Sequence, residues 1–356
     1  MRKKLLEQIE LICPRCRKVG AEGIVQYPLE LGEVLRSEGD FVSEGFLVCS
    51  HEQCRFKYPV LDGVPIVLKD MKGWWRSEES TLSVIASDAP AIQEYFAGLS
   101  LSKALSYERR CLLSSYMDLH YGGLDDAPAS FGSLANRRPF WQTVVEMAQP
   151  GSETEYCHSI DLGCSVGRYT FELARFSNLA VGIDLNFKAL SSAARFQQTE
   201  KVTYERKKHG RCFEEIRTSY RPAQNVLFLV ADVLDPPFSA ESFDLVAGLN
   251  LVDNVSLPLV LIGQMDALVK PGGGLVISSP YEWRADLCEP SEWLESDELD
   301  GSAMVRSILE GNVFPKMGLK YEVLQELMNA PWALRHHGRH WSVFLVHLIK
   351  ARKIIC

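Results

Sequence analysis

The chain has 356 residues, of which 46% are hydrophobic and 24% are charged, and these ordinary globular proportions exclude a collagen-like, coiled-coil or mainly disordered chain. The formal net charge of −8 argues against a grip on nucleic acid by the whole surface, although a local basic patch remains allowed. No apolar run is long enough for a membrane span, and the charged N-terminus lacks the apolar core of a signal peptide, so we expect a cytoplasmic protein with reduced thiols and no membrane partner.

Two close cysteine pairs lie in the first 70 residues: Cys13 with Cys16, and Cys49 with Cys54. Pairs of this kind, roughly thirty residues apart, are typical of a zinc ribbon, in which two tight turns present four thiolates tetrahedrally. Four thiolates leave no open coordination position, so the expected Zn²⁺ is structural. The alternatives are His51 in place of Cys49 or Cys54, which we rank lower, or four small buried residues without a metal.

A hairpin is predicted over residues 58–68, with its turn at Asp62-Gly63. Together with the cysteine pairs, this hairpin resembles the small zinc-ribbon protein that activates transfer-RNA and release-factor methyltransferases. In that family the ribbon stabilises a methyltransferase partner. The resemblance therefore implies that residues 1–70 form a zinc-ribbon domain fused to such a partner.

Residues 71–138 are expected to form a helical connector. Apolar residues recur at helical spacing from about Pro90 to Tyr121, and a further helix is predicted over 139–148. One interpretation is a set of packing helices that join two domains. The alternative is a lid over a substrate pocket, with the following residues as its lining: Tyr107, Tyr116, His120 and Tyr121.

From residue 139 to 356 the pattern becomes strand, turn and helix, repeated. A small-residue loop at 163–167 precedes a helix predicted at 168–176, and a proline-glycine turn at 270–274 precedes the fifth strand. The near-continuous apolar runs predict a doubly wound, mostly parallel sheet of seven strands with both faces covered. The strands are expected at 159–162, 179–184, 226–232, 243–250, 275–279, 319–324 and 341–349, with a long connection between the last two.

Acidic residues stand at the ends of the first three strands: Asp161, Asp184 and Asp232. An acid at the end of the second strand is where a ribose diol is bound in doubly wound folds. A nicotinamide dehydrogenase shares this unit, but the loop lacks the third glycine that the dinucleotide fingerprint requires. The order of glycine loop, two acids and proline-glycine turn is more specific than the loop alone.

This order resembles class I S-adenosylmethionine-dependent methyltransferases over residues 139–353. The resemblance implies that Asp161 and Gly163, with Gly167 of the same loop, hold the methionine end of the cofactor. Asp184 would bind the ribose hydroxyls, and Asp232 with the backbone of Val233 would contact the adenine. Asn250 would lie beside both the methionine and the substrate. One departure is Ser165, which stands where glycine is more usual.

The loops after the fourth and fifth strands are the first places to expect the methyl acceptor. Asn250, Asp253 and Tyr281 are the candidate catalytic residues. Asp253 could orient an amine or imidazole or take its proton, and Tyr281 with Trp283 could form a cation-accepting wall. A third region, 332–341, has basic residues that could grip a carboxylate or phosphate, form a solvated loop, or hold a metal: Arg335, His336, His337, Arg339 and His340.

Four short segments are similar to the methyltransferase module of ovothiol biosynthesis: 116–122, 250–253, 279–283 and 333–339. That module methylates an imidazole nitrogen of a thiol-bearing histidine. The resemblance implies a small zwitterionic substrate class, and the zinc ribbon is not part of it.

Three functions are compatible with these sequence features. The first is methylation of a small polar metabolite, and the second is methylation of RNA or a translation-related protein that the ribbon recognises, aided by the basic insertion at 201–221. The third is a non-catalytic partner subunit. The acceptor atom, the oligomeric state and any contact between ribbon and substrate are left open.

Overall fold

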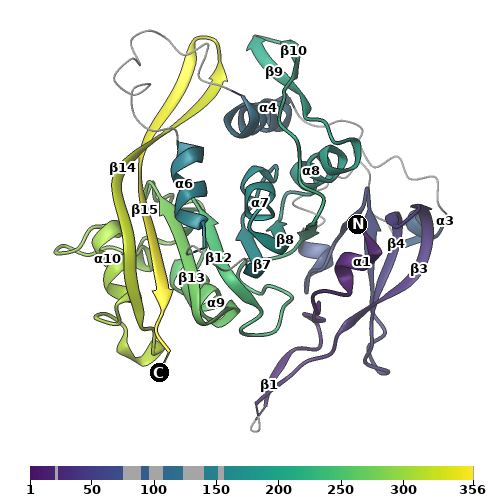
Figure 1. Cartoon of the computed structure of the whole chain (residues 1–356), viewed down its shortest axis with the longest axis horizontal. Helices are drawn as coiled ribbons and strands as arrows, with labels where there is room; N and C mark the ends of the chain where they lie inside the picture. The colour runs from purple at the N-terminus through teal and green to yellow at the C-terminus, as the bar shows by residue number, and fades with distance from the viewer. Residues whose placement is uncertain (21–22, 75–89, 96–106, 123–139, 151–155, 356) are drawn as a thin grey trace.

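The computed structural model describes residues 1–20, 23–74, 90–95, 107–122, 140–150 and 156–355. Figure 1 shows the N-terminal region in purple on one side, the central sheet in the middle, and the yellow hairpin of β14 and β15 at the opposite edge. None of the helices within these ranges is long and apolar enough to cross a membrane.

The N-terminal region is a small sheet preceded by the short helix α1 (Lys3–Leu6). Four strands pair in the order β3-β4-β5-β6, and a separate two-stranded hairpin of β1 and β2 projects from the body (Figure 1). The bounds are β1 (Lys18–Gly20), β2 (Gly23–Val25), β3 (Leu29–Glu38), β4 (Phe41–Cys49), β5 (Lys57–Leu61) and β6 (Val64–Pro65). The predicted turn between β5 and β6 is confirmed, with Asp62 at φ 49° and Gly63 at φ 78°.

The central sheet has seven strands in the order β11-β8-β7-β12-β13-β15-β14. The first five are parallel, and β15 runs antiparallel to both of its neighbours. The expected fold class is therefore confirmed. The bounds are β7 (Tyr156–Leu162), β8 (Ser177–Asp184), β11 (Val226–Val230), β12 (Phe243–Leu249), β13 (Val269–Ser279), β14 (Tyr321–His337) and β15 (His340–Lys353).

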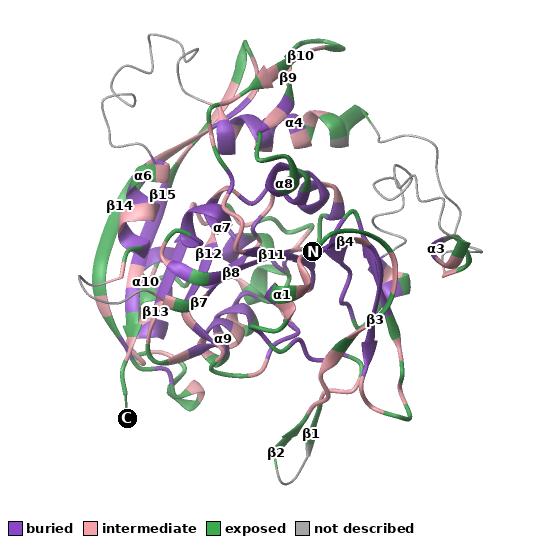
Figure 2. Ribbon diagram, turned by 45° about the vertical axis from the view of Figure 1, so that its right-hand side comes forward, coloured by how far each residue is buried: buried purple, intermediate pink, exposed green. Residues whose placement is uncertain are grey.

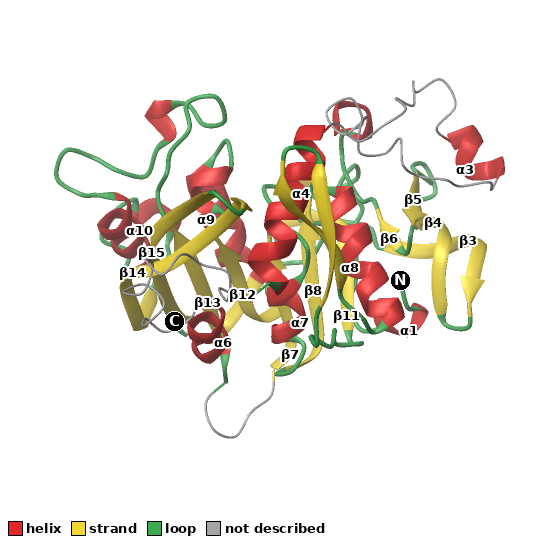
Figure 3. Ribbon diagram, turned by 90° about the horizontal axis from the view of Figure 1, so that it is seen from above, coloured by secondary structure: helices red, strands yellow, loops and turns green. Residues whose placement is uncertain are grey.

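Helices cover both faces of this sheet, and each face has its own apolar core (Figures 2 and 3). One core contains Leu261 and Val305 from α9 and α10, and the other contains Val144, Phe171 and Leu190 from α6, α7 and α8. Because successive strand residues point to opposite faces, two-sided burial explains the continuous apolar runs. The helix bounds are α6 (Phe140–Ala148), α7 (Arg168–Leu173), α8 (Phe187–Thr199), α9 (Pro258–Leu268) and α10 (Gly301–Leu309).

The remaining elements are short or lie apart from the sheet. Two pieces of the expected connector helix are described, and the residues between them are outside the described ranges. Within the basic insertion at 201–221, residues 203–217 form an antiparallel pair of strands. The bounds are α3 (Pro90–Tyr95), α4 (Tyr107–Tyr121), β9 (Thr203–His209), β10 (Cys212–Arg217), η2 (Val252–Asn254), η3 (Pro290–Glu292) and η4 (Pro315–Met317).

One expectation about the C-terminal strands is wrong. No long connection joins them, because β14 continues to His337 and turns directly into β15, where His337 pairs with His340. The physical reason is side-chain alternation: Trp332 pairs with Phe344 in the register, so an apolar row extends the hairpin beyond the sheet. The expected proline-glycine turn lies within a strand: β13 begins at Val269, but its register against β12 passes from Val269 directly to Gly274, with Gly272 at φ 77°.

The N-terminal region adds to the edge of the central sheet at β11. The N–H of Val67 donates to the carbonyl of Val230 at 2.8 Å, and Ile66 forms a parallel bridge with Val230. The N–H of Ile12 donates to the carbonyl of Pro237 at 2.8 Å. The region thus covers an edge that would otherwise expose unpaired backbone groups.

Candidate active site

A cavity of about 820 Å³ lies at the carboxyl ends of β7, β8, β11 and β12. Part of its lining, which we call the floor, consists of Asp161 and of residues in the segments that follow these strands: 163–165, 184–186, 188–189, 232–234, 249–251 and 253–256. A second part, which we call the roof, consists of aromatic and apolar side chains of α4, α6, β14 and β15. This is the location where open α/β sheets bind ligands.

Asp184 joins two parts of the floor. Its Oδ2 accepts the N–H of Ser165 at 2.8 Å, and its Oδ1 accepts the N–H of Asn186 at 2.8 Å. Ser165 adopts φ 51°, the left-handed conformation that favours glycine, which explains why glycine is more usual there. Burial raises the pKa of Asp184, while these two donors favour the carboxylate. Each oxygen keeps a lone pair with which it can accept a ligand hydroxyl.

Asp161 lines the cavity at the end of β7 and is almost fully buried, with 2% of its surface exposed. Its Oδ2 accepts the hydroxyl of Thr170 at 2.7 Å. Burial raises the pKa of Asp161 to about 7, and the nearby Asp184 acts in the same direction. A cation placed between these two carboxyls would therefore favour the ionised form of both.

The glycines of the loop have different roles. Gly163 lines the cavity at φ 70°, and a Cβ there would come within 2.8 Å of the Leu251 side chain. Gly167 does not line the cavity. It precedes α7 at φ 80°, and a Cβ would meet the Phe228 ring at 2.7 Å, so its place is explained by packing.

Asp232 and Val233 line the cavity beyond the end of β11. The N–H of Leu234 donates to Asp232 Oδ1 at 2.9 Å, which holds the turn that follows. Both predicted adenine contacts are thus brought to the same cavity as Asp161 and Asp184.

The N-terminal region supports this end of the floor from behind. Arg17 Nη1 lies 3.0 Å from Asp235 Oδ1, and Arg17 Nη2 donates to the carbonyl of Pro236 at 2.7 Å. Trp74 Nε1 donates to the carbonyl of Leu185 at 2.9 Å. The loops after β8 and β11 are therefore both fastened to residues 1–74.

Asn250 and Asp253 also line the cavity, and each connects the loop after β12 to the end of β13. Ser278 Oγ donates to Asn250 Oδ1 at 2.9 Å, and the N–H of Glu282 donates to Asp253 Oδ2 at 2.9 Å. Asp253 is 1% exposed, and burial raises the pKa of its carboxyl. The two residues hold the acceptor side of the floor in one arrangement.

Tyr281 is not brought into the cavity. Its hydroxyl bonds to His347 Nδ1 at 2.8 Å, and its ring lies against Gly301. The residues after β13 that do line the cavity are Pro280, Glu282, Arg284 and Leu287. We therefore assign Tyr281 a structural place, behind the site.

The roof is aromatic, and the sequence indicated only part of it. Tyr116 and His120 of α4 line the cavity as the lid interpretation expected. The hydroxyls of Tyr107 and Tyr121 instead bond to the carbonyls of Gly210 and Val166. Four roof residues were not predicted individually: Phe140, Trp141, Leu334 and Phe344. Alternating large apolar residues in 330–346 were the available signal.

His120 is a neutral member of this roof. It is 8% exposed, its ring centroid lies 4.8 Å from that of Trp141, and the Arg168 guanidinium donates to its carbonyl. Burial, with Arg168 nearby, lowers the pKa of His120 to about 3. The roof thus carries no charge from histidine at neutral pH.

The histidines of residues 332–341 lie at the end of the hairpin. The rings of His336 and His340 stack at 4.2 Å, and His336 Nε2 lies 2.9 Å from Ser342 Oγ. Neither ring lines the cavity, and among the described residues they do not belong to a group of metal-ligand atoms. Among the residues that could bind an anion in this region, Arg335 lies 3.7 Å from the carboxyl of Asp118.

The four cysteines of the N-terminal region come together as one cluster. Their Sγ atoms all lie within 4.8 Å of one another, and Cys16 and Cys49 are 3.7 Å apart. Sulfurs bound tetrahedrally to zinc at about 2.3 Å would lie roughly 3.8 Å apart, so the cluster fits a small zinc-binding domain. His51 Nδ1 is 3.7 Å from Cys16 Sγ, and its ring stacks on Tyr27 at 4.0 Å.

Residues 160–277 match a family model described as a methyltransferase domain. This match identifies the segment that carries the floor as a methyltransferase domain and confirms the enzyme class predicted from the sequence. No curated protein matches the chain.

Several solved structures are similar at a distance. The N-methyltransferase NodS from Bradyrhizobium japonicum WM9 is 14% identical, with 65% of this chain and 100% of that chain covered and a TM-score of 0.40. A SAM-dependent methyltransferase from Methanosarcina mazei is 15% identical, with 62% and 100% covered and a TM-score of 0.41. One from Aquifex aeolicus is 15% identical, with 64% and 95% covered and a TM-score of 0.38. These likenesses are too distant to indicate a substrate.

Proposed function

We propose that the protein transfers a methyl group from S-adenosylmethionine to a small polar acceptor that carries an amine or imidazole nitrogen. The observation that supports this most is the cavity itself, which is lined both by three strand-end carboxylates and by a neutral aromatic roof. Its volume of about 820 Å³ lies within the range of sites that enclose small molecules.

Each end of the floor suits one part of the cofactor. Asp161 and Asp184 would lie near its cationic sulfonium and ammonium groups, and Asp184 would also accept the ribose hydroxyls. Asp232 and Val233 would contact the adenine. The remaining volume beside Asn250 and Asp253, beneath the roof, would hold the acceptor.

The charge of the lining favours a neutral or cationic acceptor. Five carboxylates line the cavity, Asp161, Asp184, Asp232, Asp253 and Glu282, against the two cations Lys188 and Arg284. A phosphate-bearing acceptor would be repelled by this excess. An aromatic roof, in contrast, attracts a nitrogen that becomes positive as the methyl group arrives.

The protein's part in the reaction would be mainly positioning. The sulfonium supplies a methyl group with a good leaving group, so the nucleophile needs in-line alignment and exclusion of water. Asp253, buried and held by the N–H of Glu282, would orient the acceptor nitrogen and receive its proton. The aromatic roof would keep water from the reacting atoms.

A binding and transfer experiment tests this proposal. Calorimetry with S-adenosylmethionine and S-adenosylhomocysteine should give micromolar or tighter dissociation constants. Methyl transfer from radiolabelled cofactor should then appear with one or more compounds in a panel of imidazole- and amine-bearing amino acids, including thiol-substituted histidines. No cofactor binding, or transfer to none of the panel, would contradict the proposal.

A second candidate, methylation of RNA, is favoured by one groove. It lies beside the cysteine cluster and is lined by Arg15, Lys18 and Lys69 together with the rings of Tyr27 and Phe56. Cations interleaved with rings are suited to single-stranded nucleic acid. The test is the binding of transfer RNA to the wild type and to the R15E/K18E/K69E variant. Salt-sensitive binding that is lost in this variant would favour the second candidate over the first.

For the cysteine cluster we propose a structural Zn²⁺ held by Cys13, Cys16, Cys49 and Cys54. One equivalent of zinc should be found by elemental analysis of the purified chain, and none in the C13S/C16S variant, whose N-terminal region should lose protection from proteolysis. C157S and C212S, at exposed cysteines outside the cluster, are the matched controls. One zinc per chain in the C13S/C16S variant would refute the assignment.

A further inference from the structure

Asp118 lies on α4 on the side opposite the cavity. Tyr116 and His120 are four residues apart and share one helix face, whereas Asp118 is turned by roughly 200° from Tyr116. The carboxyl of Asp118 is buried, with the residue 6% exposed. A buried acid on the far face of a helix that carries four lining residues, Leu112, Leu113, Tyr116 and His120, is not explained by the floor or by the cofactor.

The carboxyl is shared among three segments that are far apart in the sequence. The hydroxyl of Tyr204, on β9, donates to Asp118 Oδ1 at 2.7 Å. The guanidinium of Arg206, also on β9, lies 3.9 Å from Oδ1. That of Arg335, on β14, lies 3.7 Å from Oδ2. The four residues, which we call the Asp118 cluster, bring together the connector helix, the insertion and the C-terminal hairpin.

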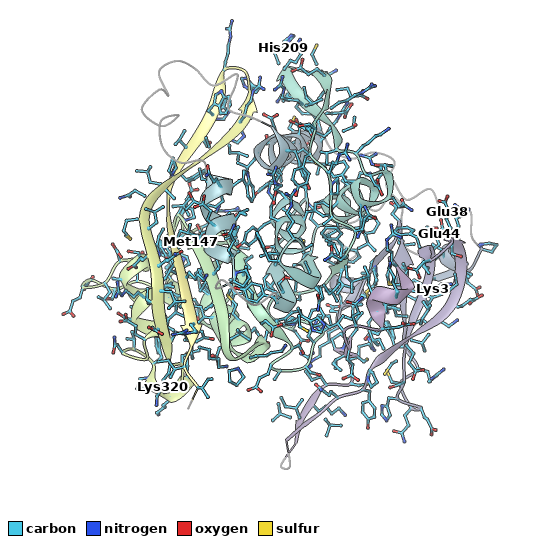
Figure 4. All side chains as sticks on the ribbon, viewed as in Figure 1. Lys3, Glu38, Glu44, Met147, His209 and Lys320 are labelled. Atoms are coloured by element: carbon cyan, nitrogen blue, oxygen red, sulfur yellow. The ribbon has the colours of Figure 1, made fainter. Side chains whose placement is uncertain are left out.

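Other contacts fasten the same helix face to the insertion. Ser114 Oγ accepts the N–H of Lys207 at 2.8 Å, and Arg110 bonds to both carboxyl oxygens of Glu205 at 2.7 and 3.0 Å. Figure 1 shows β9 and β10 beside α4, with the end of the β14–β15 hairpin nearby. His209, at the end of β9, marks the outer limit of this assembly in Figure 4.

Three basic residues of the insertion form ion pairs within it. Arg206 lies 2.8 Å from Glu214, Lys208 lies 3.5 Å from Glu214, and Arg217 lies 2.7 Å from Glu215. The side chains of Lys208 and Arg217 are more than half exposed, whereas that of Arg206 is 19% exposed and also reaches Asp118 on α4 at 3.9 Å. Arg206 therefore joins the insertion to α4.

We propose that Asp118 is a positioning residue for the acceptor: it joins α4, β9 and β14 into one unit and so fixes Tyr116 and His120 in the roof. This rests on the proposed function, because it assigns the roof to the acceptor and the floor to the cofactor. It also gives the insertion at 203–217 a function in acceptor recognition.

Hydrogen exchange on the full chain tests the unit directly. In D118A, exchange should accelerate together in 107–122, 203–217 and 329–337, by about tenfold or more, because all three lose a shared buried partner. Y204F removes one hydroxyl and should give the same pattern at smaller size. E205Q, which breaks an exposed ion pair between the same two elements, is the matched control and should change exchange little. Acceleration confined to 107–122, or none, would overturn the proposal.

The kinetic readout separates positioning from general damage. With an acceptor identified in the panel above, Y204F and D118N should raise the KM for that acceptor about tenfold, while the dissociation constant for S-adenosylhomocysteine stays within about threefold. If the acceptor KM and the dissociation constant for S-adenosylhomocysteine rose by the same factor, the role of Asp118 would be merely structural. If wild-type protein binds no S-adenosylhomocysteine, the proposed function fails, whereas the exchange experiment still decides whether the three segments form a unit.

Discussion

The floor and the roof of the cavity are built in opposite ways. The floor is made of loops that directly follow parallel strands, and its functional groups are carboxylates held by backbone N–H groups, as at Asp184. The roof is made of side chains from four elements, α4, α6, β14 and β15, and its surface is mostly aromatic and carries no formal charge. The contrast indicates that the two parts would bind different ligands: the polar floor would bind the cationic cofactor, and the roof would bind the acceptor.

The largest effect is expected at the floor. D184A removes an acceptor for the ribose hydroxyls and for two N–H groups, so the affinity for S-adenosylhomocysteine should fall by about 1–3 kcal/mol, or roughly 5- to 150-fold. Calorimetry measures this directly. D297A, at an exposed carboxylate outside the cavity, is the control. Equal affinities in wild type and D184A would separate this carboxylate from cofactor binding.

The pH dependence of cofactor binding should report Asp161. Its pKa is raised to about 7 in the protein alone, so below that pH the carboxyl holds a proton that a cationic ligand must displace. Affinity should therefore fall by about tenfold per pH unit as the pH drops below 7, and level off above it. D161N should flatten the profile between pH 5.5 and 7. A slope that persists in D161N would assign the titration to another group.

A substitution in the roof should weaken binding of the acceptor and leave binding of the cofactor unchanged. W332A removes an aromatic ring from the acceptor side. The loss of about 0.5–1.5 kcal/mol of interaction should raise the KM for the acceptor roughly 2- to 12-fold and leave the affinity for the cofactor unchanged. W293A removes a tryptophan that does not line the cavity and serves as the control. A fall in cofactor affinity in W332A would break the division between floor and roof.

The smallest effect is expected behind the floor. R17A removes the bonds to Asp235 and to the carbonyls of Pro236 and Phe238, which loosens the turn after Asp232. Cofactor affinity should fall about two- to fivefold in calorimetry, since the contact is indirect. R36A, at an exposed arginine of the same region, should leave it unchanged. If R17A and R36A bind the cofactor with the same affinity, the contacts of Arg17 with the turn after Asp232 do not affect cofactor binding.

Local signals were enough to predict the sheet and most of the floor. Seven predicted residues line one cavity because each lies at the end of a strand or in the loop after it, and the carboxyl ends of parallel strands share one edge. They are Asp161, Gly163, Asp184, Asp232, Val233, Asn250 and Asp253. Gly167 and Tyr281 are the exceptions. Both lie in the right loops, but packing against Phe228 and Gly301 directs them elsewhere, and no local pattern encodes such a contact.

The sequence by itself determined the fold class, the acids at the strand ends and the four-cysteine cluster, because periodicity, loop composition and ligand spacing are local properties. The tertiary structure alone decided the order of the strands in the sheet, and that Trp141 and Phe344 would line the same cavity as those acids. It alone also placed Asp118 between Tyr204 and Arg335. Those contacts join segments distant in the chain, and their geometry follows from how helices and strands pack, which the one-dimensional pattern does not specify.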